Sequence, residues 1–207
     1  MDVRPILLSF QTAIIAILFT FVLGTGVAYI VFRLKNRKLK ILLNSLFTLP
    51  LVLPPTVFGF FLLTIFGVQQ PVGRFLLDFF AIQVVFSWPA TVIAAVAVSF
   101  PLMYRSALTA FEQMDSELLA VAQTLGFSES RYFRKIALPL SMNGLLAGGV
   151  LAFARGLGEF GATTMLAGNI AGKTRTLPLA IYSAVASGDW RLANQYVVIM
   201  LLLCLII

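Results

Sequence analysis

Five long apolar stretches run along the chain, and short polar segments separate them. A helix needs roughly 20 apolar residues to cross a bilayer core about 30 Å thick. The pattern therefore predicts an all-α integral membrane protein with about five transmembrane helices, in a single transmembrane domain covering residues 1–207. The expected spans are residues 6–32, 41–66, 79–104, 136–166 and 192–207.

The ends of the chain lead to two further expectations. No small-residue cleavage site follows a short apolar core near the N-terminus, so we interpret the first run as a retained helix and not a cleaved signal. The last run stops while it is still apolar, whereas membrane helices commonly end in polar or basic anchors. We therefore expect the natural chain to continue beyond residue 207.

Prolines interrupt the second run at positions 50, 54 and 55. Proline removes a backbone donor and breaks the helical hydrogen-bond ladder. The break is either a simple kink or a broken helix that lines a translocation path, because broken helices are tolerated where protein or water covers the freed groups. Under the second interpretation Pro54 and Pro55 belong to the path or its gate.

The segment 111–139 is the one long polar stretch between spans, and its pattern predicts a helix–turn–helix. Asp115 suits the start of a first helix, Gly126 its end, and Ser128 the cap of a second. At Gly126 we expect a positive φ and a clash for any side chain. An apolar stripe at helical spacing is expected on the first helix, formed by Leu118, Val121, Ala122 and Leu125. This stripe either docks on a partner or rests on lipid headgroups.

Composition narrows the class of protein. Apolar residues make up 60% of the chain and charged residues 11%, against about 25% charged in a soluble domain. The mean hydropathy is +0.98, which excludes a soluble globular domain, a disordered chain and a collagen-like fibre. One cysteine and no histidine exclude a disulfide framework, histidine catalysis and a Cys/His metal site, so no metal is expected.

The net charge of +7 is interpreted as membrane topology and not as nucleic-acid binding, because no aromatic groove accompanies the basic residues. Five Lys and Arg residues lie between positions 33 and 40, which places this loop in the cytoplasm. We therefore expect the N-terminus outside, residues 105–135 inside, an external loop at 168–191 and a cytoplasmic C-terminus. Within the external loop, residues 177–189 are too short to span and suit a re-entrant or gating helix.

Arg155 and Glu159 are the ionisable pair of the fourth run, and their spacing puts them on one helix face. Ionisable groups at membrane depth are costly and usually face protein or a cavity. The charges of Arg155 and Glu159 either only neutralise each other or lie on the translocation path. Thr163 and Thr164 add hydroxyl donors near the expected outer mouth.

Two blocks resemble a known family. Residues 117–126 and 136–139 resemble the EAA loop of ATP-binding cassette importer permeases, with Gly126, Ile136, Leu138 and Pro139 in register. The EAA triplet corresponds to Ala120, Val121 and Ala122, so the motif glutamate is missing here. Glu117, one turn earlier, offers a carboxylate on the same face. The resemblance implies that these eight residues couple the chain to an ATPase subunit.

Residues 155–164 and 173–178 resemble permeases for tetrahedral oxyanions, most closely the molybdate branch, with tungstate and sulfate as alternatives. The resemblance implies a homodimer in a prokaryotic plasma membrane, two cytoplasmic ATP-binding subunits, an external oxyanion-binding protein and contact with membrane lipid. No G-x-x-x-x-G-K-[ST] motif occurs, so this chain is expected to carry no cofactor, and ATP and magnesium to bind the partner ATPase.

Two other classes compete with a transporter subunit. An ion-coupled carrier that works alone needs buried carboxylates that titrate, and only Glu159 qualifies. An intramembrane enzyme has almost no chemistry available without histidine or converging carboxylates.

Overall fold

The computed structural model describes residues 1–115 and 117–206, and within these residues the chain forms helices and no strand. The elements in chain order are α1 (Arg4–Arg33), α2 (Arg37–Val52), α3 (Pro55–Phe66), α4 (Pro71–Phe80), α5 (Trp88–Glu112), α6 (Glu117–Thr124), α7 (Glu129–Tyr132), a π-helical turn (Phe133–Ala137), α8 (Leu138–Leu140), α9 (Met142–Leu157), α10 (Gly161–Ala167), α11 (Leu177–Ala186) and α12 (Trp190–Ile206).

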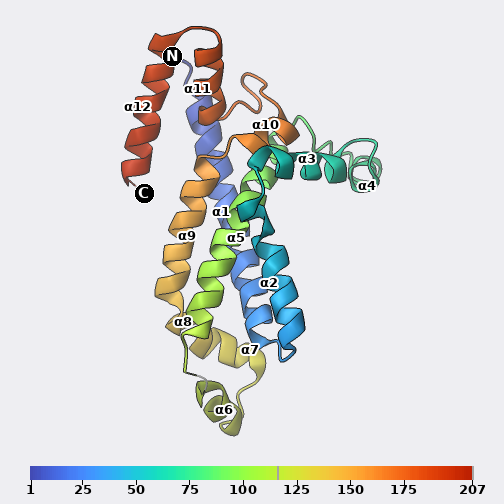
Figure 1. Cartoon of the computed structure of the whole chain (residues 1–207), viewed down its shortest axis with the longest axis vertical. Coiled ribbons are helices and arrows are strands. Elements are labelled where there is room, and N and C mark those ends of the chain that lie inside the picture. The colour runs from blue at the N-terminus through green and yellow to red at the C-terminus, as the bar shows by residue number, and fades with distance from the viewer. Residues whose placement is uncertain (116, 207) are drawn as a thin grey trace.

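Helices α1, α5 and α9 form the centre of an elongated bundle (Figure 1). Buried hydroxyl pairs join α1 to α5 at Thr12–Thr91, 3.0 Å apart, and at Thr20–Ser99, 3.1 Å apart. Both pairs are separated by 79 positions, so α1 and α5 run parallel and in register. Small residues let the helices approach closely, as is common in membranes: a Cβ on Gly24 would lie 2.7 Å from Cγ of Met103.

Two helices are long and apolar enough to cross a membrane alone, namely α1 with 30 residues and α5 with 25. The second and fourth expected spans are each divided into a bent pair of helices, which brings the number to as many as four. The fifth expected span corresponds to α12, which has 17 residues and ends at the edge of the described chain. The all-helical membrane class is confirmed, and the count of five spans stays a prediction.

The second run is two separate helices and not one kinked helix. Leu53 and Pro54 separate α2 from α3, whose axes differ by 114°. Pro50 lies inside α2, so only the Pro54–Pro55 pair ends a helix. Beyond the bend, α3 and α4 project sideways from the bundle (Figure 1).

The limits predicted for the third and fourth spans were wrong in detail. The third helix, α5, begins at Trp88 and not at residue 79, because Pro89 suits the first turn of a helix and Phe86 before it takes a positive φ of 58°. The fourth run breaks after Leu157, where residues 158–160 separate α9 from α10.

The polar segments gather at the two ends of the bundle. At one end, the ion pair Arg33–Glu129 joins the end of α1 to α7, and Lys40–Glu112 joins α2 to the end of α5. At the other end the loop before α11 meets the N-terminal helix, since the Leu177 backbone N–H donates to the Ser9 hydroxyl at 2.7 Å. The sequence therefore grouped these segments correctly, while the side of the membrane on which each end lies stays a prediction.

Candidate functional site

A compact helical hairpin, α6 and α7, lies at the end of the bundle beyond α5 (Figure 1). Gly126 ends α6 with a φ of 74°, and the N–H of Phe127 donates to the Ala122 carbonyl at 3.0 Å. The Gly126 N–H donates to the Gln123 carbonyl at 3.0 Å. Together these bonds form a Schellman motif, which fixes the angle at which the chain leaves the helix.

The expected positive φ at Gly126 is confirmed, but the expected clash was wrong. No atom lies within 4 Å of the position that a Cβ would occupy. A side chain at this position therefore meets open space, and its cost comes from the left-handed backbone alone.

Helix α7 is tied to the bundle by polar and apolar contacts. The Ser128 hydroxyl caps it by accepting the Arg131 N–H at 3.3 Å. Glu129 forms an ion pair with Arg33 at the end of α1. Tyr132 is buried, and this burial raises the pKa of its hydroxyl, which stays protonated. The hairpin is thus attached to α1 and packed into the main core.

The two faces of α6 differ from the expected stripe. Ala122 is buried, and Leu118 and Leu119 pack inward with it. Val121 and Leu125 are 53% and 70% exposed, so only this half of the expected stripe is free to meet a partner or lipid. The inward packing of Leu118 and Ala122 was not expected, because sequence periodicity gives the apolar face of a helix but not the neighbour that each residue meets.

The outward face of α6 carries Glu117, Ala120 and Val121, all exposed. We call these three residues the α6 outer face. Glu117 and Ala120 are three positions apart and share one side of the helix, and a role of the Glu117 carboxylate in place of the motif glutamate stays a prediction.

The remaining motif positions connect the hairpin to α9. Ile136 and Leu138 are half-buried against the main core, and Pro139 is the second residue of the short helix α8. Ile136 lies in a π-helical turn over Phe133–Ala137, directly before α8, which the sequence pattern did not predict. Pro139 has no N–H to donate, and this is a local signal for the π-helical turn that precedes it.

The Arg155–Glu159 pair is present at the break between α9 and α10. One guanidinium N–H of Arg155 donates to Glu159 Oε2 at 2.7 Å, and the Glu159 side chain is only 2% exposed. The other oxygen, Oε1, accepts the backbone N–H of Ala162 at 2.7 Å. Glu159 therefore has two roles in the structure, as the partner of a cation and as a cap for the first turn of α10.

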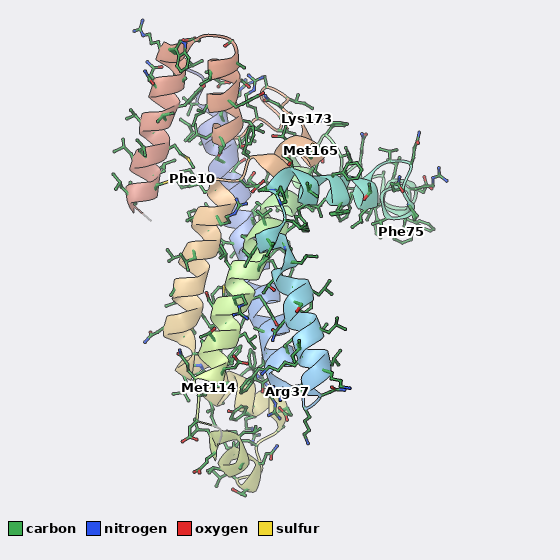
Figure 2. The ribbon with its side chains drawn as sticks, in the orientation of Figure 1. Phe10, Arg37, Phe75, Met114, Met165 and Lys173 are labelled. Carbon is green, nitrogen blue, oxygen red and sulfur yellow. The ribbon has the colours of Figure 1, made fainter. Side chains whose placement is uncertain are left out.

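Helix α10 packs closely against α3, which unites candidate residues from two distant runs. A Cβ on Gly161 would lie 2.9 Å from Cβ of Pro55, and one on Gly59 would lie 2.7 Å from Cα of Ala162. Figure 2 places Met165 of α10 beside α3, well separated from Met114 near the hairpin. The structure thus groups Pro54 and Pro55 with the α10 residues, apart from the α6–α7 hairpin.

The two threonines of α10 are less available than expected. Thr163 is buried, and the Thr164 hydroxyl donates to the Phe160 carbonyl of its own helix at 2.7 Å. Across residues 1–115 and 117–206, no group of three or more His, Cys, Asp or Glu side chains is placed to hold a metal ion.

Comparisons with known proteins find one matching family and several similar chains. The family described as "Binding-protein-dependent transport system inner membrane component" matches residues 20–207. The permease protein YvgM of Bacillus subtilis is 46% identical over 194 residues, covering 94% of this chain and 85% of that protein. The molybdenum transport system permease protein ModB of Escherichia coli K12 is 44% identical over 182 residues, covering 88% and 79%.

Among solved structures, the inward-facing MetNI methionine ABC transporter matches with a TM-score of 0.72 and covers 97% of this chain and 88% of the matched chain. At 15% identity this likeness concerns the fold alone.

Proposed function

The chain belongs to the family of binding-protein-dependent transport system inner membrane components, and on this premise we propose that it carries molybdate through the membrane of a prokaryote as the permease of an ATP-driven importer. Members of this family are transport subunits and not enzymes. The relatives named for molybdenum transport support the choice of substrate. Tungstate and sulfate, which share the tetrahedral oxyanion chemistry, are the alternatives.

The observation that carries this proposal is the α6–α7 hairpin with its exposed outer face. A short helix that is capped at Asp115 and stopped at Gly126 is rigid, because both ends have their backbone groups bonded. The α6 outer face then binds a groove of a separate ATPase subunit. Rigid-body movement of that subunit passes into the bundle through Tyr132 and the Arg33–Glu129 ion pair.

The substrate path lies, in this proposal, beside the α3–α10 contact. Pro54 and Pro55 turn α3 across the bundle, and the broken fourth span brings α10 against it. The Arg155–Glu159 pair keeps a buried carboxylate from repelling an oxyanion. Movement of α3 relative to α10 would open and close the path.

The assembly that follows contains a second copy of this chain, two cytoplasmic ATP-binding subunits with ATP and magnesium, and an external oxyanion-binding protein. The N-terminus lies outside and the C-terminus in the cytoplasm, as the basic first loop favours. Lys173 and Arg175 then lie at the outer mouth, where positive charge attracts oxyanions.

Co-purification tests the coupling role. Val121→Asp places a charge in the α6 outer face, and Ser130→Asp places one at an exposed position on α7 as a control. We expect the ATPase subunit to co-purify with wild-type and Ser130→Asp protein, and at least tenfold less with Val121→Asp. Equal recovery with all three proteins would contradict the assignment.

A further inference from the structure

A row of polar side chains follows one face of α5 into the bundle. Arg105, Thr109 and Gln113 are exposed along this helix, and Ser106 is half-buried beside them. Asn143 of α9 is exposed opposite. We call these five residues the α5–α9 polar groove.

The groove is hollow. Two open surface depressions of about 370 and 400 Å³ lie between α5 and the start of α9, and both are lined by Ala110, Gln113 and Gly144. The two depressions therefore adjoin along the same stretch of α5. Small residues keep the helices close beneath the groove, because a Cβ on Gly144 would lie 2.7 Å from Cβ of Ala110.

The register of α5 against α1 puts Arg105 within a span and not beyond it, although the sequence predicts that this span ends at residue 104. The 79-position register between α1 and α5 sets Arg105 level with Gly26, seven residues before Arg33 at the end of α1. At 1.5 Å per residue this depth is about 10 Å. A guanidinium facing lipid at such a depth is costly, so this face meets water or protein and not acyl chains.

Among the described residues, Arg105 forms no ion pair within this chain. The ion pairs of the described residues are Arg33–Glu129, Lys40–Glu112 and Arg155–Glu159, and none involves Arg105. Asp115 lines the lower depression, and its carboxylate accepts the Glu117 N–H at 2.9 Å. Arg105 is thus the cation of the groove, with hydroxyl and amide donors in the turns on either side.

We infer that the α5–α9 polar groove is a binding site for the transported oxyanion on the cytoplasmic half of its path, with Arg105 as the principal contact. A tetrahedral oxyanion offers only acceptor oxygens, and the groove supplies a guanidinium, two hydroxyls and two amides as donors. The inference rests on the proposed function and adds the place where the substrate is held after it passes α10.

Cysteine labelling tests whether the groove is wet and holds anions. In a Cys204→Ser background, Thr109→Cys puts a thiol in the groove. Leu146→Cys is the matched control. Gly144 lies against Ala110 and Gly148 against Ser106, which sets Leu146 of α9 at the depth of Thr109. The Leu146 side chain points away from α5 and is 56% exposed. We expect a negatively charged thiosulfonate to label Thr109→Cys at least tenfold faster, and molybdate to slow that reaction.

Uptake by the reconstituted complex tests the role of Arg105. Arg105→Gln should lower the molybdate uptake rate at least tenfold, Arg105→Lys less, and Lys38→Gln, an exposed position outside the groove, not at all. Recovery of the ATPase subunit should stay unchanged in all three variants. An unreactive Thr109→Cys together with normal uptake by Arg105→Gln would overturn the inference. Absence of molybdate uptake by the wild-type complex would instead contradict the proposed function.

Discussion

At the scale of single residues, Glu159 is the best example of what a sequence does and does not predict. Its pairing with Arg155 follows from the spacing of four, and the ion pair is present. Its second bond, to the Ala162 N–H, was not predicted, because it depends on the helix break at residues 158–160. The place of the pair on the substrate path stays a prediction.

Charge removal at this pair gives a test. Glu159→Gln keeps an oxygen for the Ala162 N–H but leaves the Arg155 cation without its partner, at a cost of about 2.5–3.5 kcal/mol on membrane-insertion scales. We expect uptake to fall at least tenfold. Arg155→Gln with Glu159→Gln should be milder than either single change. A double variant as impaired as the sum of the singles would argue against direct coupling of the two charges.

At the scale of elements, the α6–α7 hairpin was predicted in type and in its ends, because Gly126 and Ser128 carry strong local signals. The orientation of α6 was predicted only in part, since Leu118 and Ala122 of the expected outer stripe pack inward. The π-helical turn over Phe133–Ala137 and the start of α5 were also missed. These features depend on packing between distant segments, which a periodic pattern does not contain.

The conformation of Gly126 gives a test at this scale. Gly126→Val places a β-branched residue at a φ of 74°, which costs about 1–2 kcal/mol and should misdirect α6. Asparagine tolerates this backbone region, and no neighbour lies within 4 Å, so Gly126→Asn is the matched control. We expect Val to weaken recovery of the ATPase subunit several-fold with normal membrane insertion, and Asn to change little. Equal loss with both variants would mean that the side chain, and not the backbone, matters.

At the scale of the whole molecule, the apolar runs predicted the helical membrane class and the sorting of polar segments to two ends. The sideways course of α3 and α4 was not predicted, because proline shows that a helix ends but not the direction of the next one. The meeting of Pro55 with Gly161 is likewise a contact between distant runs that one sequence does not contain.

Orientation is testable in intact cells. In the Cys204→Ser background, Ser187→Cys marks the α11 end of the bundle and Ser130→Cys the α6–α7 end, both at exposed positions. A membrane-impermeant thiol reagent should label position 187 in intact cells, and position 130 only after the cells are permeabilised. The reverse pattern would invert the proposed topology.

The most direct measurement of the central claim is uptake of radioactive molybdate by proteoliposomes that contain this chain, its ATPase subunit and the external binding protein. The account predicts uptake that needs ATP, competes with tungstate and is lost when the ATPase subunit is left out. Uptake that proceeds without the ATPase subunit, driven by an ion gradient, would contradict it.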